Sequence, residues 1–443
     1  MIDLLIKPHS LIRNHELVRG ILATDSPEWL RSVRAEALRK FESVGLPTTK
    51  DEEFKYTPLR ALHETDFAPA YGSTIARAEV EKTTLGKFEA ITLAFVNGEY
   101  SPELSTQQIL GKGVVIAPLS EAWAHTAVEQ HLTKVATLES SLGSTNDERF
   151  VHLNTAYLGD GAFVFIPKGV ASEHPIHLLF VSREDHGAFA AHPRTLIVLE
   201  DAAQAKIVES YVGLGGTYFT NAVTEVVVGH QSNLEHVRFQ DETRESIHIG
   251  AAYVTQAADS VYTSNNFTTG AATARLDLNS NLTGEHTETW LNGAYVGNGE
   301  QILDNHTRID HRMPNCNSFE VYKGILDEKA QGVFNGKIFV YEDAQMTDAK
   351  QTNQAILLAP TAAVNTKPQL EIFADDVKCT HGATVGQLRE DAMFYLRARG
   401  IPAQEARALL VYAFAAEVLE KITIEPVRVA LEQALFAKLN PAP

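Results

Sequence analysis

The feature that most constrains the fold is a long series of short strand-like runs between about residue 91 and residue 373. These runs recur about every ten to thirteen residues, and Gly, Asn or Asp separates many of them. No helical segment of about ten residues interrupts the stretch 160–345. Because the parallel strands of a doubly wound α/β fold need crossover helices, the pattern argues against that fold.

Two β architectures remain: an antiparallel sandwich or barrel, and a β-solenoid in which each turn stacks on the previous one. About fifteen strands are more than one ordinary sandwich holds. The middle strands alternate apolar side chains with Asn, Thr, Ser and His, as in residues 261–267 and 274–279. Polar side chains stacked in ladders suit a solenoid, so we expect a mainly β chain with a solenoid core.

Helical patterns flank this core. Residues 26–28, Ser-Pro-Glu, combine a cap, a proline at the first helical position and an acid in the first turn. After residue 386 we expect one helix over 388–399, a second over 403–419 and a weaker third after Pro426. The expected parts are an N-terminal helical domain (1–85), a β core (86–386) and a C-terminal helical domain (387–443).

Charge and composition exclude several classes of function. Lys plus Arg is 38 and Asp plus Glu is 56, which gives a net charge of −18. Such a surface repels phosphate backbones and anionic lipid, so we expect neither nucleic acid nor membrane as a partner. The charged N-terminus has no secretion signal, and no window reaches the ~18 apolar residues of a membrane span. We therefore expect a reduced, cytoplasmic protein.

The densest group of reactive side chains lies in residues 375–386, DDVKCTHGATVG. Residues i and i+2 of a strand share a face, so Cys379 and His381 would point the same way. Thiolate and imidazole both bind soft or borderline metals, although two further ligands would be needed. On spacing alone, a surface turn with a small buried thiol is the favoured alternative. The chain has only one other cysteine, Cys316, and neither cysteine belongs to a C-x-x-C pair. This excludes a disulfide framework and a Cys-rich metal fold.

A second cluster lies on the predicted strand that ends at His311. Four of its side chains share one face of that strand, namely Asp304, His306, Arg308 and Asp310. A solenoid could display these side chains as the catalytic groove of a polysaccharide lyase-like enzyme. The alternative is a strand face with salt bridges, which is the commoner situation. The sequence has no phosphate-binding loop of the form G-x-x-x-x-G-K-[ST] and no G-x-S-x-G elbow, so we expect no ATP hydrolysis and no enzyme of those classes.

The predicted helix 403–419 carries a long apolar surface that includes Leu409, Leu410 and Phe414. We expect part of it to pack on the β core or on the neighbouring helix. An apolar face left over would dock a partner.

Residues 367–412 resemble the C-terminal signature of the SufB/SufD family, and the resemblance extends over essentially the whole chain. The matching segments are KPQLEI (367–372), DDVKCTHGATVG (375–386) and FYLRARGI (394–401), with support from DEEFKYT (51–57), NTA (154–156) and HPRTLI (192–197). The resemblance implies a right-handed parallel β-helix between helical domains. It further implies a non-catalytic subunit of a SufBCD complex, which assembles transient iron–sulfur clusters.

In this family SufB and SufD pair through their β-helices and bind the ABC-type ATPase SufC through their C-terminal helices. The complex can carry reduced flavin, and we expect no cofactor bound tightly to the isolated chain, which could also form a homodimer. The form H-G-A-T is similar to SufD, and Ala355 stands where SufB has its proposed cluster cysteine. The resemblance makes His381 the candidate cluster ligand at the SufB interface, Cys379 an accessory candidate, and Leu409, Leu410 and Phe414 candidates for the SufC contact. It gives no role to Cys316.

Overall fold

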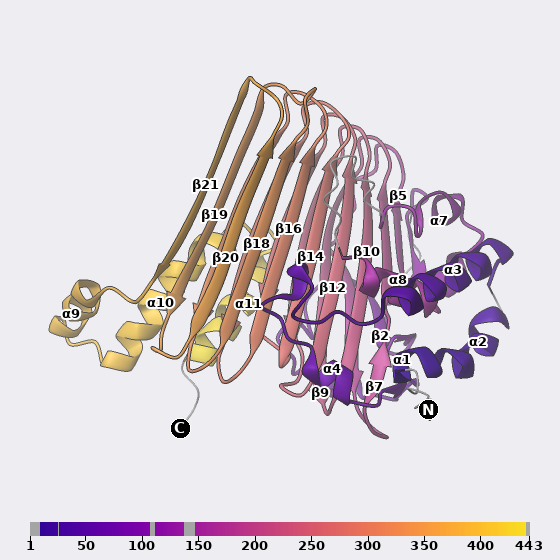
Figure 1. Ribbon diagram of the computed structural model, residues 1–443, viewed down its shortest axis with the longest axis horizontal. Helices are drawn as coiled ribbons and strands as arrows, with labels where there is room; N and C mark the ends of the chain where they lie inside the picture. The colour runs from indigo at the N-terminus through magenta and orange to yellow at the C-terminus, as the bar shows by residue number, and fades with distance from the viewer. Residues whose placement is uncertain (1–8, 25, 107–110, 137–146, 440–443) are drawn as a thin grey trace, which may run out of the picture.

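The computed structural model describes residues 9–24, 26–106, 111–136 and 147–439. Its centre is a solenoid whose successive strands alternate between two sheets, with the N-terminal helices beside its first turns (Figure 1). The predicted solenoid between helical regions is thereby confirmed. The right hand of the coil, which the resemblance implies, stays a prediction.

The two sheets run side by side along the whole solenoid. Sheet A has the order β20 (Ala363–Ile372), β18 (Gln331–Val340), β16 (Ile302–His311), β14 (Thr273–Leu282), β12 (Ile247–Gln256), β10 (Tyr218–Val228), β8 (Arg194–Leu199), β5 (Gly161–Ile166) and β4 (Val115–Pro118), with β7 (Phe189–Ala191) joining β1 (Ala68–Pro69) to β10. Sheet B has the order β21 (Val377–Gly386), β19 (Thr347–Leu357), β17 (Asn317–Leu326), β15 (Glu288–Gly297), β13 (Val261–Thr268), β11 (Asn233–Asp241), β9 (Gln204–Gly215), β6 (Ile176–Arg183), β2 (Ile91–Val96) and β3 (Glu99–Tyr100).

Equivalent residues stack directly above one another from turn to turn. Ile247 of β12 pairs with Thr273, which pairs in turn with Ile302 and then with Gln331, all in parallel. Inward side chains such as Leu276 belong to one continuous apolar core inside the solenoid. A one-residue slip would turn this core face outward, so the stacking register is strongly specified.

One corner of the solenoid repeats an unusual backbone conformation. A single non-glycine residue with φ between 55° and 61° occupies this corner in six successive turns, namely Ala202, Gln231, Asp259, His286, Asn315 and Met346. Left-handed backbone is unfavourable for most L-residues, and Asn, Asp and His adopt it more often than the others do. Three of the six, Asp259, His286 and Asn315, are residue types enriched in this conformation, whereas Ala202, Gln231 and Met346 are not. The corner therefore has no consistent residue type that would mark the repeat in the sequence.

The helices before the solenoid are α1 (Ser10–Arg13), α2 (His15–Thr24), α3 (Glu28–Val44), η1 (Glu52–Phe54), α4 (Arg60–Glu64) and α5 (Arg77–Val80). The predicted helix start at residues 26–28 is correct in position, but the prediction that Ser26 caps the helix is wrong. Helix α3 begins at Glu28 with Pro27 as its N-cap, and no side chain caps it. Ser26 instead donates to Leu22 O and accepts from the Arg34 guanidinium, which is almost fully buried.

Three helices lie within the span predicted to be β: α6 (Leu119–Ala122), α7 (Thr126–His131) and α8 (Arg149–Ala156). They cover the outer face of the first turns, where Leu119 and Val128 pack against Phe163 and Leu196. The segments 154–156 and 192–197 lock α8 onto sheet A. Asn154 there donates to two backbone carbonyls and accepts from a fully buried arginine, so these motifs are structural.

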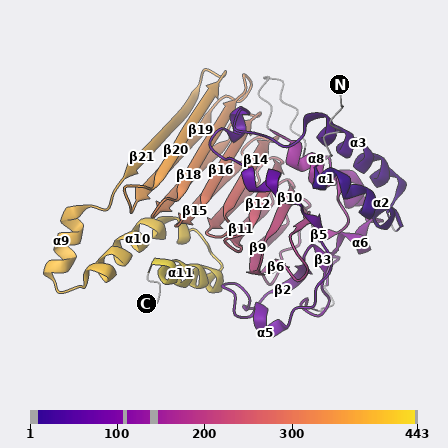
Figure 2. The ribbon, with the colours of Figure 1, turned by 60° about the horizontal axis from the view of Figure 1, so that its bottom comes forward.

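The C-terminal helices are α9 (Glu390–Ala398), α10 (Ala403–Leu419) and α11 (Glu425–Leu439). The second has the bounds that the sequence predicts. Helices α10 and α11 cover the outer face of sheet B, where Val411 and Leu431 join an apolar cluster with Val237 and Phe267 (Figure 2). Helix α9 extends away from the body of the molecule, beyond the last strands (Figure 1).

Candidate functional site at the open end of the solenoid

The solenoid ends at β20 and β21, and none of the described strands pairs with the outer edge of either. Within the part of the chain that the structure describes, β20 pairs only with β18 and β21 only with β19, so each presents one unpaired edge. Most of β21 is exposed to solvent, including Val385, and Ile372 and Phe373 at the end of β20 are exposed as well. A row of unpaired backbone groups with exposed apolar side chains is a template for pairing with another chain.

His381 and Cys379 both lie on β21, as the sequence predicts. Cys379 is half-buried and packs against the apolar core inside the solenoid. Alternation along the strand places His381 on the same inward face, yet the imidazole is exposed because no further turn covers it. Burial raises the pKa of the Cys379 thiol above its ordinary value, so the uncharged thiol is favoured near neutral pH. His381 is therefore the more accessible ligand of the two.

The two residues do not form a complete metal site by themselves. Over the described residues, no group of three or more His, Cys, Asp and Glu side chains is placed to hold a metal ion. Ala355, which stands where SufB is proposed to have a cysteine, lies one turn below β21, in register with Val385. A cluster bound at this end would need ligands from a second chain.

Cys316 lies inside the core, directly before β17 and two strands back from the edge strand β21. Its thiol is fully buried, and Sγ donates to the Gly284 carbonyl at 3.3 Å. Burial raises the pKa of this thiol as well. Its surroundings give it a packing role.

The face of β16 that could have formed a catalytic groove is covered by the chain itself. Asp304 and His306 are buried beneath the N-terminal segment 51–57. Thr57 donates to Asp304, and the imidazole of His306 lies 3.2 Å from the Glu53 carboxylate. The alternative of an open polysaccharide-binding groove on this face is therefore wrong, because the motif DEEFKYT covers Asp304 and His306, and Arg308 and Asp310 are buried as well.

The candidates for a partner contact on α10 are half-buried rather than free. Leu409, Leu410 and Phe414 are all of intermediate exposure, and the Phe414 ring packs on the outer face of sheet B. The Lys323 ammonium lies 4.6 Å from the centre of this ring and donates to the Glu417 carboxylate. Much of this apolar surface therefore fastens α10 to the solenoid.

Helix α9 carries the apolar side chains that sequence reasoning missed. Phe394 is 74% exposed and Tyr395 is 55% exposed, and none of the nine residues of this helix is buried. Both aromatics lie inside the segment FYLRARGI, so the motif is visible in the sequence although its exposure is not. Two adjacent exposed aromatic side chains on a projecting helix form a candidate partner surface.

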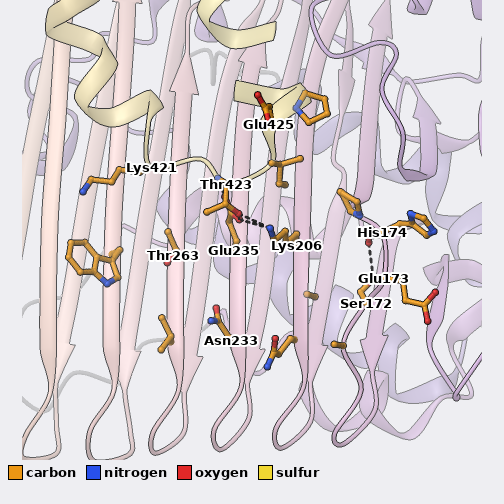
Figure 3. Close-up of a pocket in the computed structure, with 18 of the residues that line it drawn as sticks. Ser172, Glu173, His174, Lys206, Asn233, Glu235, Thr263, Lys421, Thr423 and Glu425 are labelled. Carbon is orange, nitrogen blue, oxygen red and sulfur yellow. Dashed lines mark hydrogen bonds and ion pairs between the residues drawn. The ribbon is translucent and has the colours of Figure 1, made fainter. Parts of the chain in front are cut away.

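A groove of about 690 Å³ runs across the outer face of sheet B, beside the connection between α10 and α11 (Figure 3). Thr423 of this connection donates its backbone N–H to Glu235 at 2.7 Å, and Lys206 donates to the Thr423 hydroxyl at 2.7 Å. None of the residues predicted from the sequence lines the groove. These contacts mark it as the seam between the C-terminal helices and the solenoid.

Comparison with known proteins identifies the family. Residues 180–414 match the family model described as "SUF system FeS cluster assembly, SufBD core domain", and residues 8–178 match "SufBD protein N-terminal region". The chain belongs to the SufB/SufD family. The motif-based recognition is thereby confirmed.

Individual relatives place the chain close to SufD within that family. It is 35% identical to an iron–sulfur cluster assembly SufBD family protein of Synechocystis over 89% of this chain and 88% of the relative. It is 32% identical to SufD of Escherichia coli over 93% of this chain and 92% of that protein. It is 26% identical to SufD of Bacillus subtilis over 94% and 95% respectively. No helix in the described ranges is both long and apolar enough to span a membrane.

Proposed function

We propose that this chain is the SufD-like subunit of a cytoplasmic complex that assembles iron–sulfur clusters. The observation that carries the proposal is the exposed imidazole of His381 on the unpaired edge strand β21. A cluster that is built and then released is cargo, so a site shared between two chains is chemically suitable. Such a site can be opened by moving one chain relative to the other.

The partner at the open end is a SufB-like paralogue. The unpaired edges of β20 and β21 can add strands from a second solenoid, because the backbone N–H and C=O groups along each edge are free to pair. Exposed apolar side chains at this end, Phe373 and Val385 among them, would be covered in the pair. His381 supplies one ligand to the transient cluster, Cys379 is an accessory ligand if it loses its proton, and the partner completes the set.

The partner at the C-terminal helices is a SufC-like ABC ATPase. Phe394 and Tyr395 give α9 an apolar surface that the described residues leave uncovered. The proposed subunit hydrolyses no ATP and is moved by its partner's hydrolysis, which fits the lack of a phosphate-binding loop in the sequence. The proposal requires no cofactor bound to the isolated chain, and it leaves reduced flavin to the assembled complex.

Coexpression with a SufB-like and a SufC-like protein tests the proposal. We expect a ternary complex on affinity purification, and an iron–sulfur absorption band after anaerobic reconstitution. His381→Ala should keep the complex but lose most of the cluster maturation in cells that lack the native gene. Formation of homodimers only, with no binding of the SufB-like chain, would contradict the proposed pairing. Wild-type maturation by His381→Ala would contradict the role of this imidazole.

A further inference from the structure

Three inward-facing residues line up on the last three strands of sheet B. Glu320 of β17 pairs in register with Gln351 of β19, and Gln351 pairs in register with His381 of β21. Adjacent strands lie about 4.8 Å apart, so side chains at one register position stack as neighbours. The candidate cluster ligand thus stands at the open end of a carboxyl–amide–imidazole ladder.

The amide of Gln351 is held in one orientation. Its Nε2 donates to Oε2 of Glu320 at 2.8 Å, and both side chains are about 1% exposed. An ionised carboxylate accepts hydrogen bonds but donates none, so it selects the amide nitrogen rather than the amide oxygen. Gln351 Oε1 is left as a buried acceptor without a hydrogen-bond partner in the described residues. Buried polar atoms are nearly always paired in folded proteins, so this one calls for an explanation.

A ligating histidine offers that explanation. An imidazole that binds a metal through one nitrogen usually donates the N–H of the other to a carbonyl or carboxylate, which sets its tautomer and ring orientation. Gln351 Oε1 is an acceptor of this kind at the register position next to His381.

We propose that Gln351 is a positioning residue for His381, accepting the imidazole N–H through Oε1 while Glu320 prevents the amide from turning over. The inference rests on the proposed function, since it concerns the same imidazole. With one ring nitrogen protonated and turned inward, the other is unprotonated and faces the open end, where it can donate its lone pair to iron. The two inner residues thus make His381 a prepared ligand before any cluster arrives.

NMR of protein whose histidine rings carry ¹⁵N tests the proposal directly, because the ring ¹⁵N chemical shifts distinguish the two tautomers. His381→Ala identifies the signals of that ring. Burial raises the pKa of Glu320 to about 7, so this carboxyl is mostly ionised at about pH 8, where we expect one dominant tautomer in the wild-type chain. In Gln351→Leu the ratio of the two tautomers should shift about five- to tenfold, the effect of losing one hydrogen bond. Gln354→Leu, a change of the same kind on the outer face of the same strand, should leave the ratio unchanged.

Glu320→Gln provides a variant of nearly unchanged shape. An amide at this position can both donate and accept, so the Gln351 amide is free to turn over, and His381 should populate both tautomers. Unchanged His381 shifts in a folded Gln351→Leu and in Glu320→Gln would overturn the proposal.

Cluster maturation separates this inference from the function on which it rests. We expect maturation to fall several-fold in Gln351→Leu, with binding of the SufB-like and SufC-like chains retained. If the tautomer shifts as predicted but His381→Ala matures clusters normally, the positioning stands and the proposed role of His381 fails. If His381→Ala abolishes maturation but the tautomer ratio of His381 is the same in wild type, Gln351→Leu and Glu320→Gln, the proposed function stands and this inference fails.

Discussion

The carboxylate of Glu53 accepts a hydrogen bond from the Lys337 ammonium at 2.6 Å, although the two residues are 284 positions apart in the sequence. The same carboxylate lies 3.2 Å from the His306 imidazole, and the backbone carbonyl of Glu53 accepts from Arg275. The ring of Phe54 packs under this guanidinium at 4.1 Å. One short N-terminal segment is thus fastened to three successive strands of sheet A, which ties the N-terminal region to the middle of the solenoid.

Removing the lysine should loosen this segment. In Lys337→Met the Glu53 carboxylate loses one of its two cationic partners in a mostly buried site, and we expect about 2–4 kcal/mol less free energy of unfolding. Limited proteolysis should then cut first within residues 45–60. The exposed pair of Lys367 and Glu52 is the control, because Lys367→Met removes only a solvent-screened ion pair and should barely change stability. Equal effects of the two substitutions would contradict the anchoring role.

The contribution of His306 to this contact should depend on pH. Burial and the nearby Arg275 oppose its charge, but the carboxylates of Asp304, Glu53 and Asp277 outweigh them and raise the pKa of His306 above its ordinary value. Because its pKa is higher in the folded state, protonated His306 stabilises the fold. This contribution is complete below the pKa of about 6.5 in the unfolded chain, and it is lost as pH rises through the pKa in the folded state. His306→Gln should therefore lose more stability relative to wild type at about pH 6 than at about pH 9. Urea unfolding at both pH values measures this difference, and a loss that grows with pH would contradict the assignment.

Most of the architecture follows from local pattern. Alternation of apolar and polar residues indicates strands, their number favours a solenoid, and the apolar spacing of 403–419 predicts α10 within its observed bounds. The docking of residues 51–57 on β16 could not be predicted, because no periodicity links segments so far apart. As a result, Asp304 and His306 resemble a catalytic groove in the sequence although the chain covers them.

The candidate site can be predicted from the sequence for one residue and not for others. The family motif identifies His381, because the motif is long and specific. Whether Phe394 of α9 or Phe414 of α10 contacts a partner depends on which of the two rings stays exposed after folding. Helix α10 is alanine-rich and apolar on most sides, so its sequence does not show which face packs on the solenoid. Gln351 carries no motif, and only the stacking register of β19 and β21 brings it beside His381.

Helix α9 and helix α10 should respond differently to substitution. Phe394→Asp and Tyr395→Asp should leave the circular dichroism and unfolding midpoint nearly unchanged, because these side chains are exposed, while binding of a SufC-like ATPase falls at least tenfold. Phe414→Asp should instead destabilise the chain by about 2–4 kcal/mol, since it removes the ring that packs on the outer face of sheet B. Calorimetric titration with the ATPase checks the binding. Full affinity in the double variant of α9 would place the contact elsewhere.

The two thiols should differ in reactivity. Cys379 is half-buried with a raised pKa, so iodoacetamide should alkylate it more slowly at neutral pH than it alkylates the thiol of free cysteine. Cys316 is fully buried and should react only when the solenoid unfolds. Mass spectrometry of the peptides after timed labelling distinguishes the two. Equally rapid labelling of both thiols in the folded chain would contradict their placement.

The repeated left-handed corner of the solenoid should become more stable with glycine in place of a residue that rarely adopts this backbone conformation. Met346 has φ of 61° and is 62% exposed, so its side chain adds little packing while its backbone occupies a conformation that costs an L-residue roughly 1–2 kcal/mol. Glycine avoids that cost but loses about 0.5–1 kcal/mol through the greater freedom of the unfolded chain. Met346→Gly should therefore raise the free energy of unfolding by about 0.5–1 kcal/mol.

Two further substitutions test the physical cause. Gln231→Gly, at an equivalent exposed corner with φ of 56°, should give a similar gain, and the two gains should add because the corners lie several turns apart. Asn315→Gly should gain less, since asparagine tolerates this conformation better than methionine or glutamine does. Urea midpoints of the single and double variants measure these effects. A loss of stability in both Met346→Gly and Gln231→Gly would mean that side-chain contacts at this corner outweigh the backbone strain.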